Sequence, residues 1–132
     1  MADTHITLAD LRQRVAEFVA ARAWERFHTP KNLSMAIAVE AAELMEHFQW
    51  LTTEQAITAV QDEAKRAAVA NELADVFIYG LGLANAMNLD VSAAVLSKLE
   101  RNEQRFPAEV WRRRAQETGA EHVLENRKEK TQ

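Results

Sequence analysis

The sequence has no cysteine among its 132 residues. This absence excludes disulfide bonds, thiolate metal sites and a catalytic thiol, so any metal ion must be bound by carboxylate or imidazole groups. The N-terminal residues also lack the basic start and apolar core of a signal peptide. No apolar run reaches the roughly eighteen residues that a membrane span needs without containing a charge. We therefore expect a cytoplasmic protein that does not bind membranes.

Glycine and proline are scarce, with three and two residues respectively. Strands and hairpins therefore have little turn chemistry available, whereas helix-favouring Ala, Leu, Glu, Gln and Arg are abundant. Basic residues do not predominate either, and the net charge of -4 argues against binding to a nucleic acid polymer. Because 48% of the residues are hydrophobic and 27% are charged, we expect a soluble globular chain of the all-α class.

The spacing of apolar residues predicts four long helices, which form a four-helix bundle. Thr7 and Asp10 have the spacing of a capping box, which predicts the start of the first long helix. Thr52 and Gln55 have the same spacing and predict the start of a further short helix. Asn32 and Asp90 are expected to cap the second and fourth long helices. The expected long helices cover residues 7–24, 33–50, 63–87 and 91–106. Residues 1–110 are expected to form the domain, and the charged residues 111–132 a short helix and a partly flexible tail.

Two carboxylate pairs spaced i and i+3 lie in the most apolar segments: Glu40 with Glu43, and Glu72 with Asp75. From residue 73 to residue 89 the only charged residue is Asp75, so we expect this helix to be buried, with its carboxylates pointing into the bundle. Four carboxylates in one cleft repel one another strongly. A divalent cation that prefers oxygen ligands, Mg²⁺ or Mn²⁺, would compensate this charge. The pairs therefore predict a cation site between antiparallel helices.

Simpler interpretations of these carboxylates exist. Glu40 and Glu43 share a flank of their helix with His47 and Trp50, and this flank could be solvated. Glu72, Asp75 and Tyr79 share one narrow stripe of the next long helix, and this stripe could likewise be a solvated edge. A di-iron bundle also uses facing carboxylates, but its helices carry Glu-x-x-His ligand pairs, which neither carboxylate segment contains.

Two further groups of residues are candidates for binding a ligand. Lys98 and Asn102 lie on one side of the fourth helix and could contact phosphates, or be ordinary surface residues. The aromatic side chains could stack on a nucleobase or simply pack in the core. These are Trp24, His28, Trp50 and Tyr79.

The chain resembles the MazG-like superfamily of all-α nucleoside triphosphate pyrophosphohydrolases. The resemblance covers about residues 8–107 and is strongest to the dCTP pyrophosphatase branch. It is carried by the segments "FVAARAWERFHTPKNL", "EAAELMEHFQW", "ELADVFIYGLGLA" and "SKLERNEQRFP". One departure is Val15, which stands where the animal dCTP enzymes have a histidine near the base.

The resemblance implies an enzyme that hydrolyses a (deoxy)nucleoside triphosphate to the monophosphate and pyrophosphate, with dCTP or a modified dCTP as substrate. It implies that Glu40, Glu43, Glu72 and Asp75 are the catalytic residues that bind Mg²⁺ or Mn²⁺. From the mechanism of metal-assisted hydrolysis, we expect Glu43 or Glu72 to take the proton of the attacking water. The resemblance places Lys98 and Asn102 at the phosphates and the four aromatic residues around the nucleotide. It also implies a homodimer or homotetramer. The alternatives are dUTP or phosphoribosyl-ATP as substrate, or a non-catalytic helical module that holds a structural cation.

Overall fold

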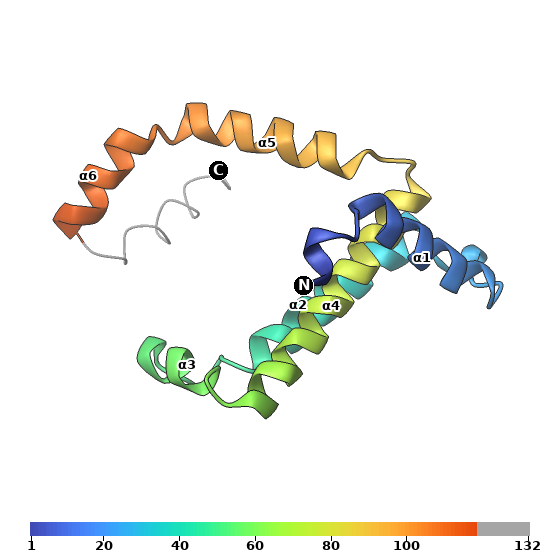
Figure 1. Ribbon diagram of the computed structural model, residues 1–132, viewed down its shortest axis with the longest axis horizontal. Coiled ribbons are helices and arrows are strands. Elements are labelled where there is room, and N and C mark those ends of the chain that lie inside the picture. Colours follow the sequence, from blue (N-terminus) through green and yellow to red (C-terminus); the bar gives the residue numbers. More distant parts are fainter. Residues whose placement is uncertain (119–132) are drawn as a thin grey trace. The chain divides into compact units, whose positions relative to one another are not determined.

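The computed structural model describes residues 1–118, which form two compact units (Figure 1). The first unit ends at Asp90 and the second begins at Val91. All elements in residues 1–118 are helical, which confirms the all-α class. The first unit contains η1 (Ala2–Thr4), α1 (Leu8–Ala20), η2 (Glu25–Phe27), α2 (Pro30–Glu46), α3 (Thr53–Ala59) and α4 (Glu63–Ala86). The second contains α5 (Val91–Arg105) and α6 (Ala108–Thr118).

The two predicted capping boxes are present. At the start of α1, the Thr7 hydroxyl accepts a hydrogen bond from the Asp10 backbone N–H at 3.1 Å, and the Asp10 carboxylate accepts one from the Thr7 N–H at 2.8 Å. Thr52 and Gln55 exchange the same two bonds at the start of α3. These reciprocal bonds satisfy backbone donors that have no partner inside the helix.

The predicted cap of α2 is wrong, because Thr29 and not Asn32 occupies the cap position. The Thr29 hydroxyl accepts from the Asn32 backbone N–H at 3.2 Å, and Pro30 takes the first helical position. Proline suits this position because its missing N–H would have no partner there. Asn32 instead donates from its side-chain amide to the Phe27 carbonyl at 2.9 Å, which ties η2 to α2.

Two helices end earlier than predicted. After α1, Ala23 adopts φ 52°, a left-handed conformation that reverses the chain, and the Trp24 N–H donates to the Val19 carbonyl at 3.1 Å. After α2, the N–H groups of Phe48 and Gln49 both donate to the Met45 carbonyl, so the helix closes in a turn over residues 47–50. Trp50 therefore lies in this turn and not on the carboxylate helix.

Helices α2 and α4 pack side by side along their length, and α1 packs against α4 (Figure 1). Gly82 of α4 marks the point where the three helices meet. A methyl group at its α-carbon would lie 3.6 Å from Leu33 Cδ2 of α2 and 4.0 Å from Val15 Cγ1 of α1. Leu33 is buried at this point, and Val19 of α1 is buried beside a cavity that Gly82 also lines. The other buried hydrophobic residues of the unit, Leu81 and Ala84, lie within two residues of Gly82 on α4.

The prediction that the third long helix is buried is wrong for most of α4. Phe77 is 60% exposed, and Leu73 and Ile78 are each 44% exposed. The reason is geometric: α4 is apolar on nearly all sides, whereas α1 and α2 cover only part of it within this unit. By length and composition alone, α4 is long and apolar enough to cross a membrane, which is weak evidence for a membrane span. The absence of a membrane partner stays a prediction.

Candidate functional site

The carboxylate pairs of α2 and α4 face each other because of the register of the two helices. Leu33 lies seven residues before Glu40, and Gly82, which meets Leu33, lies seven residues after Asp75. Seven residues are close to two helical turns, so in an antiparallel pair the same register brings the acidic residues together. Carboxylate oxygens of Glu40, Glu43 and Glu72 all lie within 4.8 Å of one another. We call these three residues the acidic cluster.

The electrostatics of the acidic cluster fit a cation. The pKa of the Glu40 carboxyl is raised by its partial burial and by the negative charges of Glu43, Asp75 and Glu72. Asp75 lies outside the group of three but is close enough to act on Glu40. Among residues 1–118, no basic side chain pairs with any of these four carboxylates. Uncompensated oxygen ligands from two helices are the donor set that Mg²⁺ or Mn²⁺ prefers.

The four aromatic residues that were predicted to surround a nucleotide lie in three separate parts of the first unit. The Trp24 and His28 rings are stacked, with centroids 6.3 Å apart and an interplanar angle of 22°. Tyr79 is half-buried on α4, one turn after Asp75. Trp50 is 87% exposed, because the turn after α2 carries it off the helix. The structure therefore pairs two of the four aromatic residues, while the role of each at a nucleotide stays a prediction.

Lys98 and Asn102 lie one turn apart on α5, where Lys98 is exposed and Asn102 is half-buried. They belong to the second unit, so their role at the phosphates stays a prediction. The charged tail also stays a prediction, because its residues 119–132 lie outside the described residues.

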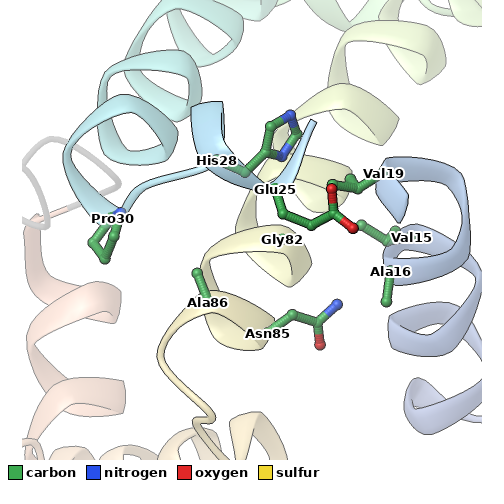
Figure 2. A pocket seen from close by; sticks show the side chains of 9 residues that line it. All are labelled: Val15, Ala16, Val19, Glu25, His28, Pro30, Gly82, Asn85 and Ala86. Atoms are coloured by element: carbon green, nitrogen blue, oxygen red, sulfur yellow. The ribbon is translucent and has the colours of Figure 1, made fainter. Parts of the chain in front are cut away.

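A cavity of about 360 Å³ lies in the first unit beside the meeting point of α1, α2 and α4 (Figure 2). Its wall includes Val15 and Val19 of α1, Glu25 and His28 in and after η2, and Gly82 and Asn85 of α4. Asn85 joins two of these helices: its Oδ1 accepts from Arg12 Nε at 3.0 Å, and its Nδ2 donates to the Arg12 carbonyl at 2.9 Å. Two residues of the cavity were singled out from the sequence: His28 as a ligand contact, and Val15 at the position where the animal dCTP enzymes have a histidine near the base.

Glu25 and His28 also form a Glu-x-x-His pair, the single one in the sequence. It lies in the short η2 segment and not on the carboxylate helices. A di-iron bundle needs such pairs on two helices, in addition to the facing glutamates, so this pair does not favour that alternative.

Comparison with known proteins identifies the family and agrees with the helical fold. The model of the MazG-like family matches residues 35–119, which include all four carboxylates. dCTP pyrophosphatase 1 of Homo sapiens is 44% identical over 106 residues, and that of Rattus norvegicus is 42% identical over the same length. The alignments cover 80% of this chain and 62% of each relative, so the chain spans less than two thirds of their length.

A solved structure shares the fold. The crystal structure of a pyrophosphatase from Archaeoglobus fulgidus superposes with a TM-score of 0.71 at 37% sequence identity, covering 76% of this chain and 92% of that one. The matched family segment, the relatives and the shared fold confirm the resemblance that the carboxylate spacing indicated. The chain belongs to the MazG-like family.

Proposed function

We propose that the chain is an enzyme that hydrolyses a (deoxy)nucleoside triphosphate, dCTP or a modified dCTP, to the monophosphate and pyrophosphate with Mg²⁺. The observation that carries this proposal is the acidic cluster, in which three carboxylates from two helices converge within 4.8 Å and have no basic partner among residues 1–118. The relatives named dCTP pyrophosphatase 1 support the choice of substrate, and the Archaeoglobus pyrophosphatase supports the class of reaction.

The residues of the chain have separate tasks in this reaction. Glu40, Glu43, Glu72 and Asp75 would bind the metal ion, which when bound neutralises triphosphate charge and makes a water molecule more acidic. One of these four residues would also accept the proton of the attacking water, through a carboxylate oxygen that does not ligate the ion, and we assign this role to Glu43 or Glu72. Glu43 is the exposed member of the acidic cluster and is therefore accessible to solvent. Lys98 and Asn102 contact the phosphates, and the aromatic residues surround the base.

Removing one carboxylate at a time tests the proposal. We expect Glu43→Gln and Asp75→Asn each to lower kcat by about 100-fold or more, because even outer-shell partners of a metal site commonly contribute 10–100-fold. The measurement is pyrophosphate release from a panel of dNTPs, including 5-methyl-dCTP, with Mg²⁺. Circular dichroism of both variants should match the unmodified protein.

Glu54→Gln is the matched control, because Glu54 is an exposed glutamate on α3 outside the acidic cluster. This variant should keep full activity. Full activity in both Glu43→Gln and Asp75→Asn would refute the role of the carboxylates.

The same nucleotide panel separates the alternatives. Turnover of dUTP or phosphoribosyl-ATP in place of dCTP would keep the reaction and change the substrate. No pyrophosphate from any nucleotide would favour a non-catalytic module with a structural cation.

The remaining proposals concern the setting of the enzyme. We place it in the cytoplasm, with residues 1–110 as the catalytic domain and residues 111–132 as a charged tail. We also propose a homodimer or homotetramer, which the exposed apolar side chains of α4 support. Neither a membrane nor a nucleic acid polymer is proposed as a partner.

A further inference from the structure

The cavity and the acidic cluster lie along one face of α4. Glu72, Asp75, Tyr79, Gly82 and Ala86 recur at intervals of three and four residues, which place them on a single stripe of a helix. Gly82 and Ala86 line the cavity. Seven residues separate Asp75 from Gly82, a rise of about 10 Å along the helix axis. A ligand with its phosphates at the carboxylates would therefore reach the cavity with its other end.

The size of the cavity suits a small aromatic ring system. About 360 Å³ lies at the lower end of the range of small-molecule pockets. Gly82 contributes no side chain to the wall, and Val15, Ala16 and Val19 give α1 an apolar side. Such a wall contacts the faces of a base but does not distinguish one base from another.

Few polar groups of the cavity have free hydrogen-bonding capacity. Asn85 already donates to and accepts from Arg12, so its amide is engaged. Glu25 and His28 are the remaining polar side chains in the lining. Figure 2 shows the Glu25 carboxylate extending from η2 toward Val15 and Val19 of α1. Among residues 1–118, no group donates a hydrogen bond to this carboxylate or forms an ion pair with it.

We propose that Glu25 is a specificity-determining residue whose carboxylate accepts a hydrogen bond from the exocyclic amino group of a pyrimidine base in the cavity. This inference rests on the proposed function, since the base belongs to the nucleotide whose phosphates meet the acidic cluster.

The chemistry of the bases explains the selectivity. Cytosine carries an amino group at C4, which is a hydrogen-bond donor, and carboxylates accept from it. Uracil and thymine carry an oxygen acceptor at the same position, which a carboxylate repels. A glutamine at position 25 removes the discrimination, because its amide both donates and accepts. His28 also lines the cavity, and its ring N–H is a donor for the acceptors of either base.

The test compares dCTP with dUTP in the full-length protein and in Glu25→Gln. We expect the unmodified protein to prefer dCTP in kcat/KM, and the variant to reduce the dCTP-to-dUTP ratio by about tenfold, as for the loss of one charged hydrogen bond. Glu25→Ala should also lower dCTP turnover, with a smaller gain for dUTP than Glu25→Gln gives, because alanine removes the repulsion but supplies no donor. Glu54→Gln is the matched control and should keep the ratio. Because Glu25 is exposed and has no side-chain partner in the described part of the chain, all variants should unfold at the same temperature.

A second measurement keeps the inference independent of turnover. Calorimetry with dCMP and dUMP in the presence of Mg²⁺ should show a preference for dCMP that Glu25→Gln loses. If no nucleotide is hydrolysed but this preference appears and is lost in the variant, the proposed reaction fails and the role of Glu25 stands. An unchanged dCTP-to-dUTP ratio in Glu25→Gln, or equal binding of dCMP and dUMP by the unmodified protein, would overturn the assignment of Glu25.

Discussion

Asp10 shows how two hydrogen bonds set the properties of a single residue. Its carboxylate accepts from the Thr7 hydroxyl at 2.7 Å and from the Thr7 backbone N–H at 2.8 Å. These bonds favour the ionised form and lower the pKa of Asp10 below its usual 3.8, the side-chain bond being the larger cause. A lowered folded-state pKa means that the contribution to stability is present above pH 3.8 and is lost as the pH falls through the folded-state value.

Replacing Thr7 should therefore affect both stability and titration. We expect Thr7→Ala to lower the free energy of unfolding by about 1 kcal/mol, the usual value for an N-cap. The pKa of Asp10 should rise toward 3.8 in the same variant. Urea unfolding and an NMR titration of the Asp10 carboxyl measure the two effects.

Thr58→Ala is the control, because the Thr58 hydroxyl donates to the Glu54 carbonyl within α3 and does not cap a helix. It should change stability much less. Equal losses in the two variants, with the Asp10 pKa unchanged in Thr7→Ala, would contradict this account of the cap.

The acidic cluster could be predicted residue by residue, whereas most of the cavity lining could not. Glu40, Glu43 and Glu72 stand out because charges in apolar helical segments violate the usual pattern. Glu25 lies in a short polar segment, where a glutamate is unremarkable in sequence. Asn85 gains its meaning from Arg12, 73 residues away, and such a tertiary contact leaves no local signal.

Among the helices, α4 shows where sequence patterns suffice and where they fail. Its start at Glu63 and its end near Met87 follow from the apolar pattern, and the Asp62 side chain caps it by accepting from the Lys65 N–H at 2.8 Å. Its burial could not be predicted, because an apolar circumference does not show which neighbours are available to cover it. The early end of α2 was equally hidden, since Trp50 fits the helical stripe in sequence but follows a turn in the structure.

The exposed side of α4 leads to a prediction about assembly. We expect sedimentation equilibrium to give the mass of two or four chains, and Phe77→Glu to lower it, because a charge on this apolar surface must be desolvated in a contact. Ile57→Glu is the matched control, since Ile57 of α3 is 63% exposed and Phe77 is 60% exposed. A mass of one chain for the unmodified protein would refute the oligomer.

For the whole molecule, the fold class and the family follow from sequence, but assembly and substrate do not. The helical composition and the carboxylate spacing were sufficient to indicate an all-α protein with a cation site. The proposed assembly depends on what covers the exposed apolar side of α4, and the proposed substrate depends on a cavity built from four segments. Both therefore require measurements on the folded protein.

Metal binding by the acidic cluster is the central claim, and titration with Mn²⁺ tests it most directly. Electron paramagnetic resonance of free Mn²⁺ measures binding without any substrate. We predict saturable binding to the unmodified protein and to Glu54→Gln, and a loss of affinity of about tenfold or more in Glu40→Gln and Glu72→Gln. Identical Mn²⁺ affinity in all four proteins, or no binding to the unmodified protein, would contradict the claim.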